Sequence, residues 1–248
     1  MIPLIAVAHG SRDPRSARAV AAALTAVRRR HPEFDVRLAF LDLNSPSVPQ
    51  VLDTVAAEGH RCAVVVPLLL GSAFHARIDL PALLAESRIR TPHLEVVCSD
   101  ILGDDELLVA AARDHIVATG VSADDPTVGV ALCAVGSRRL GANSSSAMVT
   151  PRILAGTAWT LGRTCFATAT GPSVEAALTE LSRSGARTFV LAPWMLAPGL
   201  LWDRACAAAE PLHRVHIAAT LTDHEAVGEV IAARYLDTVA ASPALVTA

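Results

Sequence analysis

CAVVVPLLL, residues Cys62–Leu70, indicates the fold class more directly than any other segment of the chain. It is a short, almost continuous run of β-branched and leucine residues, which is typical of a strand buried on both faces in the middle of a parallel sheet. Even when it is extended to Phe74, the run is interrupted by Pro67 and Gly71 and falls short of the ~20 apolar residues that span a bilayer. We therefore expect a central strand at this place, and no membrane as a partner.

Outward from this run, short apolar segments alternate with segments of helical character. Asp13-Pro14 and Ser45-Pro46 each offer a capping residue followed by proline, as at the start of a helix, and Gly59 suits a helix end. Alternation of this kind implies a parallel sheet with right-handed crossovers. The elements expected in the first half are strands at 4–8, 35–41, 62–70 and 94–99, and helices at 14–30, 46–59, from 75 or 78 onward, and 104–119.

The chain repeats itself at an offset of 126 residues. Gly10-Ser11-Arg12 recurs as Gly136-Ser137-Arg138, and Pro46-Ser47-Val48 recurs as Pro172-Ser173-Val174, all without a gap. Because the matched residues include the glycines and prolines that set loop geometry, we infer a duplicated unit. The predicted fold is α/β with two similar doubly wound parallel-sheet lobes. The predicted parts are an N-terminal lobe over 1–120, a linker over 121–127 and a degenerate C-terminal lobe over 128–248.

Charge and composition exclude several classes of function. A net charge of −3 gives no reason to expect nucleic acid as a partner. All 21 basic residues are arginine, which excludes a Walker-type phosphate loop and Schiff-base catalysis by lysine. The sequence also lacks a Gly-x-Gly-x-x-Gly motif, so we expect no organic cofactor. Five cysteines, without a Cys-x-x-Cys pair, indicate free thiols in a reducing cytoplasm.

Three polar residues follow the first three expected strands, namely His9, Asp42 and His75. Ligands of open parallel sheets bind beyond the carboxyl ends of the strands, so we expect these side chains at one edge. Two imidazoles and a carboxylate suit Fe²⁺, Co²⁺ or Ni²⁺ and leave coordination positions open. Each residue alone also fits an ordinary turn or helix-start role. Their common edge is what favours a metal site.

The repeat supplies an internal comparison for these three residues. Their counterparts at the offset of 126 are Val135, Thr168 and Leu201. A role in the framework would preserve the polar groups in both copies, whereas a single functional site allows their loss from one. The comparison therefore favours one metal site, in the N-terminal lobe.

Several motifs together resemble the sirohydrochlorin chelatases of the CbiX/SirB type. The likeness is strong over residues 3–120 and weaker over 128–240. The motifs are Ala8–Pro14, Phe40–Pro46, Val66–Leu70, His75–Pro81 and the segment 102–108. The resemblance implies a class II chelatase fold and insertion of a divalent metal, without ATP, into sirohydrochlorin during siroheme or cobalamin biosynthesis. It also implies that this duplicated chain acts as a monomer, as a fused version of the dimer that short members form.

The resemblance assigns roles to the candidate ligands. The two histidines of the family map onto His9 and His75. Asp42 stands where the family has a glutamate, and its shorter side chain moves the carboxylate back by one methylene. A neutral imidazole can bind a metal or accept a pyrrole proton near neutral pH. Our hypothesis is that His9 and His75 hold the metal and take up protons, while Asp42 orients or supplements them.

A substrate rich in carboxylates needs cations at the rim of its site, and arginine offers forked donors for them. Solvated arginines at helix starts are the simpler alternative. The residues expected to contact the substrate are Ser11, Arg12, Arg77 and Arg138.

Two other functions compete with metal insertion. A metal or tetrapyrrole carrier could use the same scaffold without increasing the rate of metallation. A hydrolase that uses Ser11 is the third reading, and the lack of a Gly-x-Ser-x-Gly elbow argues against it.

Overall fold

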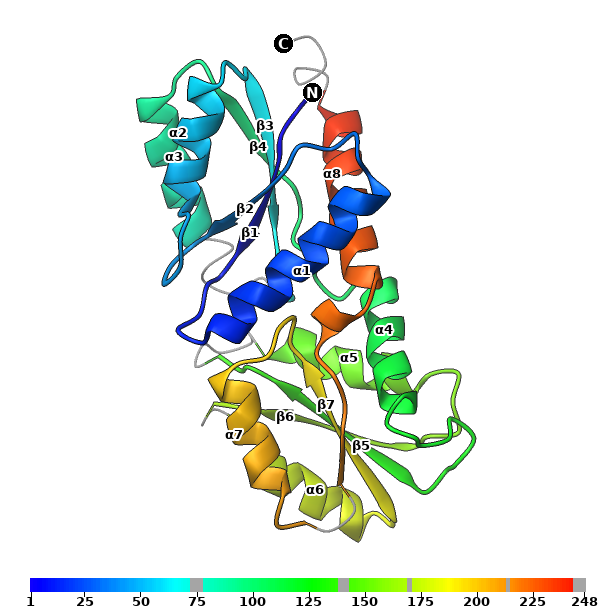
Figure 1. Cartoon of the computed structure of the whole chain (residues 1–248). Coiled ribbons are helices and arrows are strands. Elements are labelled where there is room, and N and C mark those ends of the chain that lie inside the picture. Colours follow the sequence, from blue (N-terminus) through cyan, green and yellow to red (C-terminus); the bar gives the residue numbers. More distant parts are fainter. Residues whose placement is uncertain (72–77, 138–142, 169–170, 213–214, 243–248) are drawn as a thin grey trace. The chain divides into compact units, whose positions relative to one another are not determined.

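The chain forms two compact units, each with its own parallel sheet (Figure 1). Unit 1 comprises Met1–Gly103 and Glu225–Ala248, and unit 2 comprises Asp104–His224. The predicted α/β class with two similar parallel-sheet lobes is confirmed. The computed structural model describes residues 1–71, 78–137, 143–168, 171–212 and 215–242.

The sheet of unit 1 has the strand order β2-β1-β3-β4, and its strands are parallel. The two central strands, β1 and β3, are fully buried, which explains why their sequences are continuously apolar. Strand β3 ends three residues before the apolar run does. Leu68 still donates its N–H to the carbonyl of Val7, and the chain then turns, with the Leu69 N–H donating to the carbonyl of Pro67. The strands are β1 (Leu4–Ala8), β2 (Val36–Phe40), β3 (Cys62–Pro67) and β4 (Glu95–Cys98).

Helices cover both faces of this sheet (Figure 1). Helices α2 and α3 pack on one face, and α1 and α8 pack together on the other. Helix α2 begins two residues later than Ser45-Pro46 predicts, because Ser47 and Gln50 form a capping box. The helices are α1 (Pro14–Arg30), α2 (Val48–Ala57), α3 (Leu80–Arg90) and α8 (Ala226–Ala241).

Unit 2 repeats the arrangement with the strand order β6-β5-β7-β8. Helices α6 and α7 form a core with one face of its sheet, and α4 packs against β7 and α5. The strands are β5 (Val128–Ala134), β6 (Leu161–Phe166), β7 (Thr188–Trp194) and β8 (Val215–Ile217). The helices are α4 (Glu106–Val117), α5 (Ser144–Leu154), α6 (Val174–Arg183), α7 (Leu200–Ala209) and the 3₁₀ turn η2 (Leu221–Asp223).

The last helix of each repeat packs in the unit formed by the other repeat. Helix α4 belongs to the first copy in sequence, yet it lies in unit 2, where Arg113 donates to the carbonyls of Arg152 and Ile153. Helix α8 closes unit 1, where the Tyr235 hydroxyl donates to the carbonyl of Ile2. The division at 121–127 predicted from the repeat therefore does not coincide with the boundaries of the compact units.

The offset of 126 holds from β1 to β3 and for their counterparts in unit 2, and then the second copy becomes shorter. Ala63 pairs with Val96, whereas its counterpart Phe189 pairs with Val215, which lies 119 residues after Val96. Leu201 sits in the first turn of α7, which takes the place of α3 in unit 2. Leu201 is therefore not the counterpart of His75, and that comparison from the sequence does not hold.

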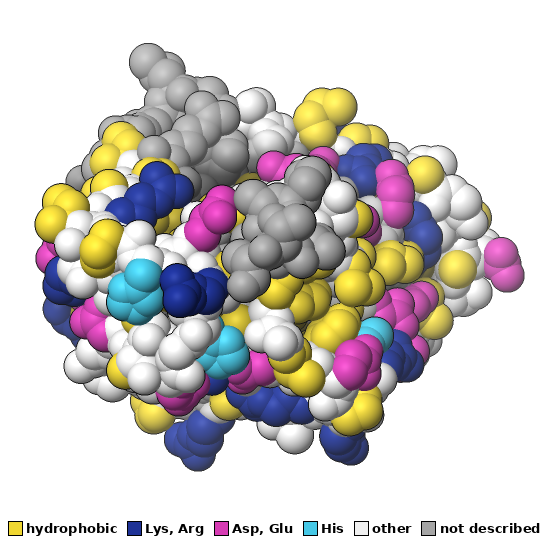
Figure 2. Space-filling model, turned by 90° about the horizontal axis from the view of Figure 1, so that it is seen from above, with side chains coloured by type: hydrophobic (Ala, Val, Ile, Leu, Met, Phe, Trp, Pro, Cys, Tyr) yellow, Lys and Arg dark blue, Asp and Glu magenta, His cyan; other side chains and the backbone are white. Residues whose placement is uncertain are grey.

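The described cysteines are free thiols, as the sequence predicts. Cys62, Cys133 and Cys165 are buried, whereas Cys98 is exposed. On the face seen in Figure 2, acidic and basic side chains are intermixed with apolar ones outside the grey atoms. In the described part of the chain, no helix is both long and apolar enough to cross a membrane.

Candidate metal site

The carboxyl edge of the sheet in unit 1 brings His9 and Asp42 onto neighbouring loops. His9 follows β1 directly, and Asp42 is the second residue after β2. The Asp42 N–H donates to the His9 carbonyl at 3.0 Å, and the Leu41 N–H donates to the Ala8 carbonyl at 2.9 Å. Strand pairing thus continues beyond β1 and β2, and it joins two of the three predicted ligand positions through their backbones. We call this pair of hydrogen bonds the two-loop frame.

Gly10 allows the two loops to approach this closely. Its φ angle is +96°, and a Cβ atom at this position would lie 1.8 Å from the carbonyl oxygen of Asp42. No residue other than glycine fits here without moving the backbone.

The turn after β2 directs the carboxylate of Asp42. The Leu43 N–H donates to Asp42 Oδ1 at 2.7 Å, and the Asn44 N–H donates to the Asp42 carbonyl at 2.8 Å. Leu43 has a φ angle of +64°, which is uncommon for a residue other than glycine. The Asp42 side chain is exposed, and this turn engages its Oδ1.

Asn44 is part of the site and was not predicted from the sequence. Its Oδ1 accepts the N–H of Ser11 at 2.7 Å, which ties the loop after β2 to the loop after β1. The signal available in the sequence was an asparagine two residues beyond a candidate ligand, a residue type that often hydrogen-bonds to backbone in turns.

Ser11 has a helix-start role in this structure. Its Oγ accepts the N–H of Asp13 at 3.0 Å, and Asp13 in turn caps α1 through the Arg15 N–H. Hydrogen bonds from Arg15 lower the pKa of Asp13, which keeps the cap charged. This role of the Ser11 hydroxyl weighs against a hydrolase that uses Ser11 as its nucleophile.

The remaining predicted residues are only partly covered by the structure. Arg12 is exposed and forms no ion pair with the described residues. The described ranges contain no group of three or more His, Cys, Asp or Glu side chains that could hold a metal ion. His75, Arg77 and Arg138 lie outside the described residues.

Unit 2 contains the same two-loop frame without the ligands. The Thr168 N–H donates to the Val135 carbonyl at 3.1 Å, and the Ala167 N–H donates to the Ala134 carbonyl at 2.9 Å. Gly136 repeats the positive φ, at +85°. The imidazole of His9 and the carboxylate of Asp42 are thus replaced by Val135 and Thr168, while the two backbone hydrogen bonds and the positive φ recur.

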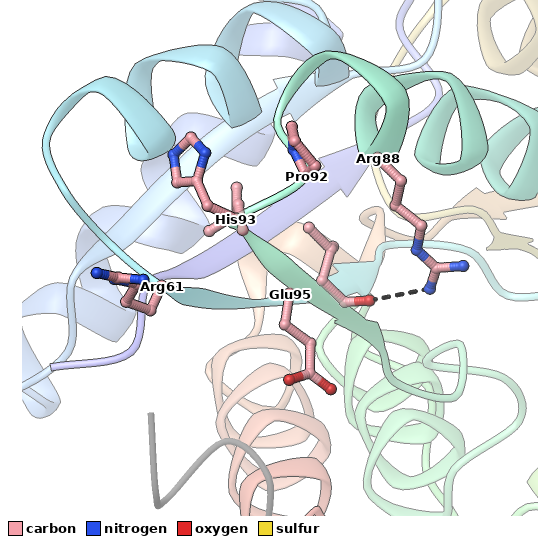
Figure 3. A pocket seen from close by; sticks show the side chains of 7 residues that line it. Arg61, Arg88, Pro92, His93 and Glu95 are labelled. Atoms are coloured by element: carbon pink, nitrogen blue, oxygen red, sulfur yellow. Dashed lines mark hydrogen bonds between the residues drawn. The ribbon is translucent and has the colours of Figure 1, made fainter.

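A cavity of about 760 Å³ lies at the opposite, amino end of β3 and β4. Figure 3 shows that Arg61, Arg88, His93 and Glu95 point in different directions around it. Arg88 is engaged with the carbonyl of Val96 at 3.3 Å. Because the charged groups do not converge, this shallow cavity offers no centre for catalysis.

The sequence profile of the CbiX family matches residues 3–119 and 129–238, which is most of the chain. The chain belongs to the CbiX family. Among its relatives, the sirohydrochlorin cobaltochelatase of Priestia megaterium is 27% identical over 210 residues, covering 82% of this chain and 67% of the relative. The sirohydrochlorin ferrochelatase of Bacillus subtilis strain 168 is 26% identical over 208 residues, covering 81% and 76% of the two chains.

Solved structures agree with the CbiX assignment at the level of fold. SirB from Bacillus subtilis with Fe³⁺ has a TM-score of 0.85 at 24% identity, with 97% of this chain and 96% of that chain covered. The SirB of the subspecies spizizenii in complex with cobalt has a TM-score of 0.76 at 22% identity, with 96% and 95% covered. The predicted resemblance to CbiX and SirB proteins is therefore confirmed.

Proposed function

We propose that this protein inserts a divalent metal ion, Fe²⁺ or Co²⁺, into sirohydrochlorin. Membership of the CbiX family and relatives that are sirohydrochlorin cobaltochelatases and ferrochelatases support the reaction. The observation that carries the site is the two-loop frame, which occurs in both units but carries an imidazole and a carboxylate only in unit 1. Divergence that preserves these backbone hydrogen bonds and loses only the imidazole and the carboxylate is what a single active site permits.

In the proposed mechanism, His9 and His75 bind the incoming metal and Asp42 contributes one carboxylate oxygen. Metallation requires two pyrrole protons to leave while ring nitrogens replace water on the cation. A neutral imidazole can bind the metal first and accept a proton afterwards, because both tasks use the same lone pair. Residues 1–120 supply this site, and the chain acts as a monomer with one active site.

The carboxylates of the substrate are assigned to Ser11, Arg12, Arg77 and Arg138. Arg12 supports this assignment, because its exposed guanidinium lies three residues from His9 and forms no ion pair with the described residues. Forked hydrogen bonds from arginine to a carboxylate would orient the macrocycle over the metal.

Anaerobic incubation of the purified protein with sirohydrochlorin and Fe²⁺, Co²⁺ or Ni²⁺, followed by absorbance, tests the reaction. We expect a metallation rate well above the protein-free control for Fe²⁺ or Co²⁺. His9→Ala should lose most of this rate, whereas His93→Ala, at the amino end of β4, should keep it. Tight binding of metal and tetrapyrrole at the protein-free rate would instead identify a carrier.

A further inference from the structure

The serines that follow Gly10 and Gly136 each donate their N–H to an asparagine side chain. The asparagine comes from a different part of the chain in each unit. In unit 1, Ser11 donates to Asn44, which is 33 residues away on the other loop. In unit 2, Ser137 donates to Asn143 at 2.7 Å, and Asn143 returns a hydrogen bond to the Ser137 carbonyl at 3.1 Å. The contact therefore spans two loops in unit 1 and closes a local turn in unit 2.

The bond between the two loops occurs in the unit that carries the candidate ligands. In unit 1 the loop after β1 carries His9 and the loop after β2 carries Asp42, so a bond across the two loops fixes the spacing of two donors. The Asp42 N–H holds the His9 carbonyl, and Asn44 holds the Ser11 N–H, so the chain is held on both sides of Gly10, directly after His9. In unit 2 no donor pair has to be spaced, because Val135 and Thr168 occupy these positions.

We propose that Asn44 is a positioning residue for the metal site, which sets the separation of His9 from Asp42 through the Ser11 N–H. The inference rests on the proposed function. A metal site tolerates errors of only about 0.5 Å in the placement of its ligands, and partners outside the coordination sphere supply that precision. Asn44 touches neither the metal nor the substrate in this role.

The test is a titration with Co²⁺ in the absence of tetrapyrrole, followed by cobalt absorbance, on the full-length protein and three variants. Asn44→Ala removes the bond across the loops, and Asn143→Ala removes the matching local bond. Asn44→Asp keeps an acceptor oxygen, and about 0.5 M salt screens its added charge. Thermal melts report the loss of stability in each variant.

Asn44→Ala should bind Co²⁺ about 10-fold more weakly, the lower end of the range for outer partners of metal ligands. Asn143→Ala should bind within about twofold of the wild type even if it loses as much stability, and Asn44→Asp should recover most of the affinity. Unchanged affinity in Asn44→Ala, or equal weakening in both alanine variants, would overturn the inference while the proposed function stands. A wild-type protein that neither binds Co²⁺ nor metallates sirohydrochlorin would overturn both.

Discussion

Gly10 combines a φ angle of +96° with a carbonyl oxygen 1.8 Å from the position of a Cβ atom. Gly59 has a similar φ of +89°, but nothing lies within 4 Å of its Cβ position. A substitution at either glycine therefore meets an unfavourable φ angle. Only a substitution at Gly10 also meets the backbone of the neighbouring loop.

We predict that Gly59→Ala costs about 1 kcal/mol of unfolding free energy, the cost of a left-handed conformation with a Cβ atom. Gly10→Ala should cost about 3 kcal/mol or more, because the clashing atom belongs to the backbone and no side-chain rotation relieves it. Urea denaturation of both variants measures the difference. Equal losses would show that the loops can separate without penalty.

Among the helices of unit 2, His115 in α4 packs its ring against that of His224, the residue that follows η2. The centroids of His115 and His224 are 5.5 Å apart at an interplanar angle of 88°. Within the described part of the chain, the buried Nε2 of His115 has no hydrogen-bond partner. Burial, and then the neighbouring His224, lower the pKa of His115 below its ordinary value of 6.5, and the opposing effects of Asp223 and Asp114 are weaker.

This lowered pKa predicts a loss of stability in acid. Above about pH 7.5 the His115 ring is neutral in the folded and unfolded chains, so it contributes nothing to a pH dependence. As the pH falls through 6.5, the unfolded chain binds a proton that the folded chain resists, and the unfolding free energy decreases. Urea denaturation at pH 7.5 and pH 5.5 should show a smaller decrease in His115→Leu than in the wild type, and an identical decrease would refute this account.

Most elements could be predicted from the sequence because local signals determine them. Asp13-Pro14 marks the start of α1, and the unbroken apolar pattern of Leu4–Ala8 marks β1, and both elements have the predicted limits. The start of α2 was misplaced because Ser45 and Ser47 are both good caps, and only the reciprocal bond to Gln50 decides between them.

Across the full chain, the exchange of α4 and α8 between the units follows no local signal. Both helices are apolar enough to pack on either sheet, and the repeat makes the two docking surfaces alike. The sequence thus predicted a boundary at 121–127, whereas packing divides the chain after Gly103 and before Glu225. Part of the site could be predicted from the sequence. The carboxyl ends of parallel strands lie at one edge of the sheet, and this does not depend on which helices cover the sheet.

The exchange predicts the behaviour of a chain cut in the segment 121–127. A specific protease site inserted after Asp124 separates two fragments, and each fragment carries the helix that completes the other unit. The fragments should remain together on native gel filtration, because α8 buries residues such as Val230, Ile231 and Tyr235 in unit 1. A truncation before α8 should weaken this association, because only α4 then joins the two fragments. Fragments of the intact sequence that separate freely would mean that each repeat closes on its own last helix.

We propose that His9, His75 and Asp42 bind the same metal ion. X-ray absorption at the cobalt edge, on protein loaded with one equivalent of Co²⁺, counts imidazole ligands directly. We predict two imidazole ligands in the wild type and one in each of His9→Ala and His75→Ala. Asp42→Asn should keep both imidazoles and replace the carboxylate oxygen ligand by an amide or water oxygen. The same imidazole count in the wild type and in His9→Ala would contradict the assignment of the metal to the carboxyl edge of unit 1.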